Sequence, residues 1–228
     1  MSKKAFFITG TDTDAGKTLV ATGLLAAARL RGLSTLGLKP VAAGCTRTEQ
    51  GLRNSDALAL QAQSTLPVVY EQVNPVALEA AIAPHIAALQ EKRSLSADRL
   101  AGFCRSSLRQ ADFTLVEGAG GWRIPLNPSE TLANLAQLLR LPVVLVVGMR
   151  LGCINHALLT VEAIRNDGLP LVGWVANVLD ADMPVLEENI ASLAQRIPAP
   201  CLGVVPRLSM ASADAASAHL DLTPLLDA

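Results

Sequence analysis

The sequence predicts an α/β fold with a doubly wound, mainly parallel β-sheet flanked by helices. Three observations predict this class. Short apolar runs rich in β-branched residues recur along the chain, segments with helical spacing separate them, and a glycine-containing loop joins the first run to the first helix. Because several runs are apolar at nearly every position, we expect strands that helices cover on both faces.

The expected elements alternate from the start of the chain to its last strand. Six strands are predicted, at residues 5–9, 35–39, 112–117, 142–147, 171–177 and 201–205. Helices are predicted at residues 17–31, 96–110, 127–140, 155–167 and 183–196, with a further helix starting near residue 54. Strands separated by helices in this way favour parallel pairing in one sheet.

Capping residues support the predicted helix ends. Gly32 follows the first helix as a natural C′ residue. Ser96 is an N-cap candidate for its helix. In the next helix Asn127 is the expected N-cap, with Pro128 at N1 and Glu130 at N3.

Composition indicates one globular domain without a nucleic-acid or membrane surface. The 228 residues are 50% hydrophobic and 17% charged, with a net charge of −1. No linker or repeat divides them, so we expect a single domain over residues 1–228, with a loosely packed tail at 209–228. The basic residues are scattered, which argues against nucleic acid as a partner. The longest apolar stretch, residues 141–149, is too short to span a bilayer.

The cysteines and the start of the chain point to the cytoplasm. None of the four cysteines has metal-ligand spacing, and we interpret them as reduced thiols that mostly pack in the core. The apolar run at the start is too short for a signal-peptide core. A cytoplasmic protein is therefore expected.

The loop "GTDTDAGKT", residues 10–18, is a variant phosphate-binding loop. Five residues separate Gly10 from Gly16, where the usual pattern has four. The "GKT" end is intact and opens a helix, so backbone N–H groups and the helix dipole should favour phosphate oxygens. Lys17 would reach the β- and γ-phosphates and Thr18 would offer its hydroxyl to Mg²⁺. The fold is thus expected to be of the P-loop NTPase type.

Two carboxylates are candidates for further Mg²⁺ ligands. Glu117 ends an apolar strand, where the P-loop class usually supplies an acidic group, although a strand-terminal carboxylate is often only a solvated cap. Asp56 follows Asn54 at a helix start, where it either complements the helix dipole or provides an oxygen ligand.

Lys39 stands out at the carboxyl end of the second strand, in "GLKPVAAGC". That edge of a doubly wound sheet faces the ligand crevice. An ordinary surface lysine is the alternative. If Lys39 faces this crevice, Lys17 and Lys39 place two ammonium groups at one site, which suits an anionic intermediate. We expect desolvation or the nearby Lys17 to depress the pKa of Lys39. Whether Lys39 is a base or an electrostatic clamp is open.

Several longer motifs resemble the dethiobiotin synthetase family. They are the variant loop "GTDTDAGKT", "GLKPVAAG", "GLRNSDALALQ", "NPVALEAAIAPHIAA", "LVEGAGGW", "LPVVLVVGMRLGCINHALLT", "GWVAN" and "IPAPCLGVVPRL". They occur in order from residue 6 to about residue 208. Two of them, "LGCINHALLT" and "VEGAGGW", are far more specific than a P-loop alone.

The resemblance implies an ATP-dependent ligase of biotin biosynthesis that acts as a homodimer. 7,8-Diaminopelargonate would take up CO₂ as a carbamate, ATP would phosphorylate the carbamate oxygen, and the second amine would close the cyclic urea of dethiobiotin. Lys39 and Lys17 would be the catalytic residues, with MgATP as co-substrate.

The resemblance also implies a set of site residues. The nucleotide would contact Asp14, Ala15, Gly16, Lys17, Thr18, Leu19, Asp56, Glu117, Gly118, Ala119, Gly120, Asn177, Val178, Pro206, Arg207 and Leu208. Mg²⁺ would be held by Thr18, Asp56 and Glu117. The diamine would contact Thr13, Lys39, Ala43, Gly152, Cys153, Ile154 and Asn155, the last four from the partner subunit.

Some positions depart from the family pattern or have plainer interpretations. Ala43 stands where the family often has a hydroxyl residue, and Asp14 where a Glu is typical. We expect the acidic side chains of the loop to face an amine, a lysine or metal-bound water, since bare phosphate would repel them. Asn177 has the alternative of a turn residue and Cys153 that of a packing residue.

Other protein classes remain as alternatives. A nucleotide-switched assembly or partitioning-type ATPase shares this fold group, but such proteins usually carry a second, earlier lysine in the loop. A cobalamin-pathway or other amidating synthetase would normally append a glutaminase domain, for which the chain has no room.

Overall fold

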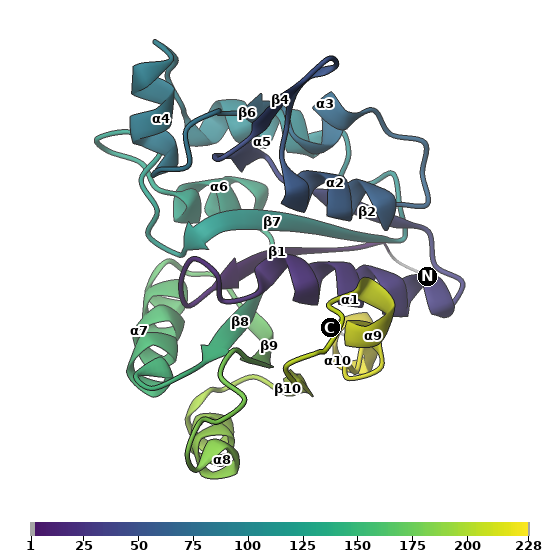
Figure 1. Cartoon of the computed structure of the whole chain (residues 1–228), viewed down its shortest axis with the longest axis vertical. Coiled ribbons are helices and arrows are strands. Elements are labelled where there is room, and N and C mark those ends of the chain that lie inside the picture. The colour runs from purple at the N-terminus through teal and green to yellow at the C-terminus, as the bar shows by residue number, and fades with distance from the viewer. Residues whose placement is uncertain (1–2, 228) are drawn as a thin grey trace.

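Six parallel strands form the central sheet of the computed structural model, which describes residues 3–227 (Figure 1). In space they run in the order β10-β9-β8-β1-β7-β2. Their bounds are β1 (Lys4–Gly10), β2 (Thr35–Leu38), β7 (Phe113–Gly121), β8 (Val143–Met149), β9 (Leu171–Val178) and β10 (Cys201–Val205). The predicted doubly wound α/β class and all six predicted strands are confirmed.

Side-chain alternation along β1 divides the core into two layers. Phe6 and Ile8 pack into one hydrophobic cluster, while Phe7 between them packs into another. All three are at most 2% exposed. Successive strand residues point to opposite faces, so the sheet is buried on both sides, as the nearly continuous apolar runs predict.

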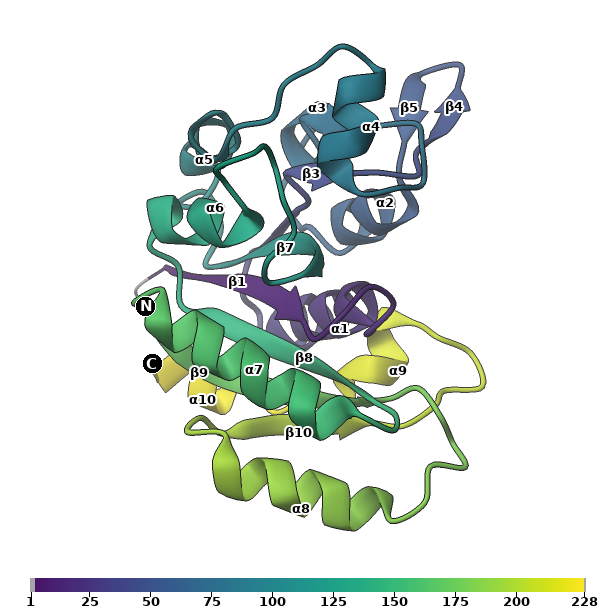
Figure 2. The ribbon, with the colours of Figure 1, turned by 90° about the vertical axis from the view of Figure 1, so that its left-hand side faces the viewer.

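Helices cover each face of the sheet (Figure 2). One layer holds α1 (Lys17–Leu30), α2 (Ser55–Ala62), α9 (Ala213–Ser217) and α10 (Thr223–Asp227). The other holds α5 (Ala97–Arg105), α6 (Leu132–Leu139), α7 (Cys153–Asn166) and α8 (Leu186–Arg196). The phosphate-loop helix and α7 therefore lie on opposite sides of the sheet and begin at the same edge.

Between β2 and β7 the chain forms a subregion that the sequence pattern missed. It contains β3 (Val41–Ala42) paired with β6 (Val76–Ala77), and the hairpin of β4 (Thr46–Thr48) and β5 (Gly51–Arg53). The short helices α3 (Tyr70–Val73) and α4 (Pro84–Gln90) complete it. Strands of two or three residues are too short to produce a recognisable alternation.

The predicted start of α6 is wrong. The helix begins at Leu132, and Thr131 and Asn134 form the capping box. Asn127 instead accepts hydrogen bonds from the backbone N–H groups of Ser129 and Glu130, which makes a turn before the helix. Its side-chain oxygen thus satisfies a local turn that competes with the helix cap.

The expectation of a loosely packed tail also fails for residues 213–227. Ala216, Leu222 and Leu225 are fully buried in the cluster that includes α1. A β-carbon placed on Gly23 of α1 would lie 2.9 Å from the Ala216 side chain, so α1 and α9 are in close contact there. The leucines near the end of the sequence, such as Leu222 and Leu225, were the feature from which this packing could have been predicted. Residues 1, 2 and 228 of the predicted domain lie outside the described residues.

No helix within residues 3–227 has the length and hydrophobicity needed to cross a bilayer.

Candidate active site

The phosphate loop connects the carboxyl end of β1 to the first turn of α1. Gly16 and Asp14 have positive φ angles, of 89° and 59°, which shape the loop before the helix. The Lys17 ammonium bends back across the loop and donates to the Asp12 carbonyl over 2.9 Å. A β-carbon on Gly10 would lie 3.0 Å from the Lys17 side chain, so a glycine at this position leaves room for the lysine stem.

Lys39 lies at the centre of a charged cluster beneath this loop. Its Nζ is 2.5 Å from Oε1 of Glu117 and 3.0 Å from Oδ2 of Asp56. It also donates to the Gly118 carbonyl over 3.2 Å. The Thr18 hydroxyl donates to the same Glu117 oxygen over 2.9 Å. Four side chains, from the end of β2 and from α1, α2 and β7, thus converge on one point.

The two lysines of the site differ in their electrostatics. Burial alone would lower the pKa of Lys39, but attraction to Glu117 and Asp56 outweighs burial, and the pKa is raised. The expected depression of this pKa is therefore wrong. Burial and then repulsion by Lys39 lower the pKa of Lys17. Lys39 is thereby held in its charged form.

The residues of this cluster fit a hard divalent cation. Oε2 of Glu117 is buried, and no hydrogen-bond partner reaches it from within residues 3–227. The Asp56 side chain is 39% exposed, so its carboxylate is open to the cavity. Together with the Thr18 hydroxyl these groups offer only oxygen ligands, the type that Mg²⁺ prefers. No cluster of three or more His, Cys, Asp or Glu side chains suited to a metal occurs in the described chain.

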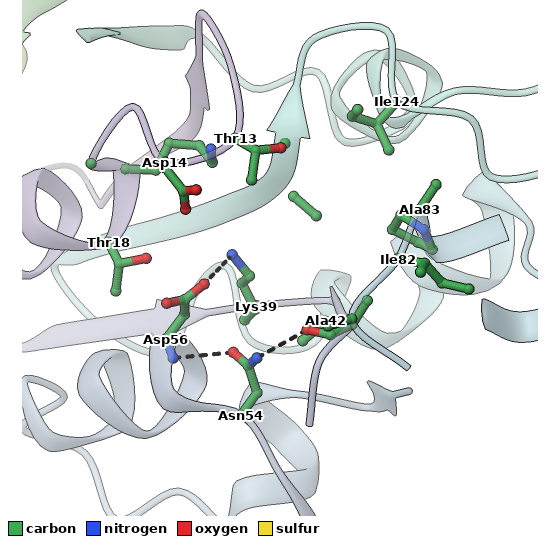
Figure 3. Close-up of a pocket in the computed structure, with 17 residues that line it drawn as sticks. Thr13, Asp14, Thr18, Lys39, Ala42, Asn54, Asp56, Ile82, Ala83 and Ile124 are labelled. Atoms are coloured by element: carbon green, nitrogen blue, oxygen red, sulfur yellow. Dashed lines mark hydrogen bonds and ion pairs between the residues drawn. The ribbon is translucent and has the colours of Figure 1, made fainter. Parts of the chain in front are cut away.

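A cavity of about 710 Å³ opens beside the cluster (Figure 3). Lys39 points into it between the loop residues Asp14 and Thr18 on one side and Ile82 and Ala83 on the other. Its lining is formed by Thr13, Asp14, Gly16, Lys17, Thr18, Lys39, Ala42, Ala43, Asn54, Asp56, Ala81, Ile82, Ala83, Pro84, Ala119, Gly120 and Ile124. The cavity is large enough for a small organic substrate beside a phosphate group.

Ten of the predicted site residues line this cavity, and the structure brings them together from four separate segments. Glu117 and Gly118 lie directly behind it, in contact with Lys39. The lining does not include Ala15, Leu19, Asn177, Val178, Pro206, Arg207, Leu208, Gly152, Cys153, Ile154 or Asn155.

The cavity also has walls that sequence reasoning missed. The segment of residues 81–84, together with Ala42 and Ile124, supplies mostly apolar surface. Asn54 caps α2 by accepting from the N–H groups of Asp56 and Ala57, and its amide donates to the Ala43 carbonyl over 3.4 Å. None of these residues is charged. Asn54 and residues 81–84 lie in the motifs "GLRNSDALALQ" and "NPVALEAAIAPHIAA", and Ala42 lies in "GLKPVAAG", whereas Ile124 lies in no motif that the sequence analysis names.

Asn177 and the segment after β10 lie behind the phosphate loop. The Asn177 amide donates to the Ala15 carbonyl over 3.0 Å, and the side chain is 4% exposed. Arg207 donates to the Leu179 carbonyl over 3.2 Å. These contacts join the ends of β9 and β10 at the side of the loop away from Lys39.

The "LGCIN" turn opens α7, as predicted, but lies outside the cavity of its own chain. Gly152 has a φ of 92° and precedes the first helical residue, Cys153, which is buried. Asn155 is exposed, and Leu151 is 98% exposed. This turn therefore places an apolar residue, Leu151, and the start of a helix at the surface.

Fold and site together define a P-loop nucleotide-binding protein. A family model described as an AAA domain matches residues 4–215. Among solved structures, the septum site-determining protein MinD of Pyrococcus horikoshii, complexed with Mg-ADP, matches with a TM-score of 0.57 at 14% identity. That match covers 98% of this chain and 90% of MinD. A ParA family ATPase of Chlorobium tepidum matches with a TM-score of 0.55 at 12% identity, covering 99% and 92%. Such likenesses show the fold alone.

Curated relatives narrow the class. The chain is 64% identical to the ATP-dependent dethiobiotin synthetase BioD of Pseudomonas paraeruginosa, over 97% of each chain. It is 57% identical to the protein of that name from Chromohalobacter salexigens, over 92% of each. It is 49% identical to the one from Marinobacter nauticus over the full length of both. The chain belongs to the ATP-dependent dethiobiotin synthetase family. Enzymes of that name are ligases that form a ureido ring by making C–N bonds.

Proposed function

We propose that this chain makes dethiobiotin from 7,8-diaminopelargonate, CO₂ and ATP, in the biosynthesis of biotin. The observation that carries the proposal is the position of Lys39, charged and buried, between the phosphate loop and a cavity with apolar walls. A carbamate and a γ-phosphate are both anionic, and a fixed positive charge between them lowers the barrier to bringing them together. Full-length similarity to named dethiobiotin synthetases supports the same chemistry.

The reaction divides into three steps that these residues assist. One amine of the diamine adds to CO₂ and loses a proton, giving a carbamate. A carbamate oxygen then attacks the γ-phosphorus of ATP and ADP leaves, with Lys17 and Lys39 stabilising the charge that spreads over the phosphoryl oxygens. The second amine attacks the carbonyl carbon of the mixed anhydride, loses a proton and expels phosphate, which closes the cyclic urea.

Lys39 serves in this proposal as an electrostatic clamp. Its raised pKa keeps the ammonium protonated, so it cannot remove a proton from the attacking amine in that state. Thr13 and Ala43 line the same cavity and would contact the diamine. The apolar wall of residues 81–84 and Ile124 suits the aliphatic part of such a substrate.

Thr18, Asp56 and Glu117 would hold Mg²⁺, since their oxygens meet beside Lys39 and Oε2 of Glu117 has no other partner in residues 3–227. When bound, the cation supplies charge neutralisation at the β- and γ-phosphates. Lys39 pairs with both carboxylates in the structure, so it also compensates their charge before the cation binds.

The remaining nucleotide contacts are proposed from the places of these residues in the fold, next to the phosphate loop. Asp14, Ala15, Gly16 and Leu19 belong to the loop and first turn that would wrap the phosphates, and Gly118, Ala119 and Gly120 continue β7 beside it. The base would lie beyond the loop, near Asn177 and Val178 at the end of β9 and near Pro206, Arg207 and Leu208 after β10.

A homodimer is part of the proposal. The turn of Gly152, Cys153, Ile154 and Asn155 does not reach the cavity of its own chain, yet it presents helix N–H groups suited to a carboxylate. From a second protomer the same groups would hold the carboxylate end of the diamine. The four free cysteines suit a reducing compartment, and we place the reaction in the cytoplasm.

Product analysis by mass spectrometry tests the proposal directly. The purified protein, given MgATP, bicarbonate and 7,8-diaminopelargonate, should form the cyclic urea and release phosphate, and omission of the diamine should stop phosphate release. Lys39→Ala and Lys17→Ala should each reduce turnover at least about a hundredfold, whereas Lys92→Ala, an exposed lysine outside this cavity, should retain it. Steady ATP hydrolysis that needs no diamine would instead support the partitioning-type ATPase.

A further inference from the structure

Asp12 of the phosphate loop forms an ion pair with Arg150, a residue outside the loop. The Arg150 guanidinium donates to Oδ2 of Asp12 over 2.6 Å, and the Thr13 backbone N–H donates to Oδ1 over 2.8 Å. Asp12 is one of the five residues that separate Gly10 from Gly16. Its carboxylate therefore has a partner on each oxygen, and the expectation of an amine, lysine or metal-bound water as partner is wrong for this residue.

Continuous contacts lead from the catalytic lysine of the loop to the start of α7. The Lys17 ammonium donates to the Asp12 carbonyl over 2.9 Å, and the Asp12 carboxylate pairs with Arg150. The Cys153 N–H then donates to the Arg150 carbonyl over 3.0 Å, which closes the turn before the helix. These contacts connect the loop to the turn through a single residue on each side, Asp12 and Arg150.

Thr11, at the start of the phosphate loop, is hydrogen-bonded to β8. The Thr11 N–H donates to the Val146 carbonyl over 3.0 Å, and the Gly148 N–H donates to the Thr11 hydroxyl over 3.3 Å. Beyond Met149 the chain leaves the sheet and reaches Leu151, which is 98% exposed. In the described structure Arg150 is the side chain that ties this exposed segment back to the loop.

We propose that Asp12 and Arg150 are positioning residues whose ion pair fixes the turn of residues 151–155 relative to the phosphate loop. The inference rests on the proposed role of that turn in holding the carboxylate of the diamine. In the proposed homodimer the loop serves one active site and the turn serves the other. The pair therefore couples nucleotide binding in one protomer to carboxylate binding in its partner.

Two single substitutions and their combination test the pair by steady-state kinetics. Asp12→Asn keeps the acceptor for the Thr13 N–H but removes the charge, and Arg150→Gln removes the other charge. Each should raise the KM for the diamine about threefold to fivefold, the size expected for a partly exposed ion pair, with a smaller change in kcat. The double variant should be no worse than either single one, since the contact is already lost. Arg150→Lys should restore most of the affinity.

A matched control uses another short, exposed ion pair. Arg47 and Glu79 are 2.7 Å apart, with exposed side chains, and Arg47 lies on the β4–β5 hairpin. Arg47→Gln should leave the KM for the diamine unchanged. Raising the ionic strength should weaken the effect of Asp12→Asn, because screening already removes part of the pair in the wild type. Additive effects of the two substitutions would overturn the proposal.

Hydrogen exchange gives a readout that does not depend on the diamine. Amides of residues 151–156 should exchange more slowly in the wild type when MgADP is added, and this protection should be lost in Asp12→Asn. If the wild type makes no cyclic urea, the proposed function fails, while faster exchange in Asp12→Asn still supports the tether. If exchange at the turn is the same in both proteins, with and without MgADP, the proposed tether is wrong whatever the enzyme makes.

Discussion

The Lys39 ammonium lies 2.5 Å from Oε1 of Glu117, with the lysine side chain 4% exposed and the glutamate fully buried. A buried charge that loses its partner is strongly destabilising. Glu117→Ala should therefore lower the free energy of unfolding by about 3 kcal/mol. Asp56 pairs with the same lysine but is 39% exposed, so Asp56→Ala should cost less than about 1 kcal/mol. Denaturant unfolding measures both, and equal losses would contradict the assigned difference in burial.

Gly16 and Asn177 leave no room for a side chain between them. A β-carbon on Gly16 would lie 2.0 Å from the Asn177 amide nitrogen, and the φ of Gly16 is 89°. Gly16→Ala should lower the unfolding free energy by about 2 kcal/mol or more and abolish detectable nucleotide binding. Gly102→Ala is the control, because Gly102 lies within α5 with nothing near its missing β-carbon. It should stabilise the protein by about 0.5–1 kcal/mol. Calorimetry and nucleotide titration distinguish the two variants.

Leu222 tests the packing of the last helices. It is fully buried, whereas Met210 in the preceding segment is 78% exposed. Leu222→Ala should lower the unfolding free energy by about 2–4 kcal/mol through lost burial and an uncollapsed cavity. Met210→Ala should change it by less than about 0.5 kcal/mol. Similar small effects of both changes, in denaturant melts, would restore the picture of a loose tail.

Because of Cys104, the stability of the protein should decrease with rising pH in the alkaline range. Burial raises the pKa of its thiol from 9.0 to about 12. The neutral thiol is therefore favoured in the folded state, and this contribution is complete below pH 9 and is lost as the pH rises toward 12. Between these pH values the free energy of unfolding of the wild type should fall by up to about 1.4 kcal/mol per pH unit more than that of Cys104→Ala. Unfolding curves at several pH values measure the difference, and parallel curves would refute the assignment.

A substitution at Ala43 should strengthen the binding of the diamine. It lines the cavity beside Lys39 and carries no hydroxyl. Ala43→Ser should add one hydrogen bond to the bound diamine and lower its KM about twofold to tenfold. The KM for ATP should stay unchanged, because the nucleotide would contact the opposite wall. A higher KM for the diamine would show that the cavity at residue 43 is already filled by substrate.

The strands of the sheet were predictable because each has enough apolar residues to give an unambiguous pattern. β8, for example, is buried at all seven positions. The short β3 to β6 were not, since two or three residues carry no period. The α6 start was missed because Asn127, Pro128 and Glu130 have the composition of a cap but use it in the preceding turn. Local hydrogen bonding decided between two structures that share one sequence signal.

The charged centre of the candidate site was also within reach of the sequence. Lys17, Lys39, Asp56 and Glu117 are charged residues at strand or helix ends, and parallel strands bring such ends to one edge. The apolar wall of residues 81–84 could not be predicted from the sequence, because uncharged residues that line a cavity resemble uncharged residues in a core. The sign of the pKa shift of Lys39 needed the distances to both carboxylates, which no spacing in the sequence encodes.

The packing of α9 and α10 on α1 affects how the protein is made. α1 follows directly on the phosphate loop and is synthesised early, but its apolar face is covered in part by residues 213–227, which leave the ribosome late. During translation that face remains open to water and to other nascent chains, where exposed apolar surface favours aggregation. A chaperone that shields α1 until the last helices emerge would raise the yield of folded protein without altering its final stability.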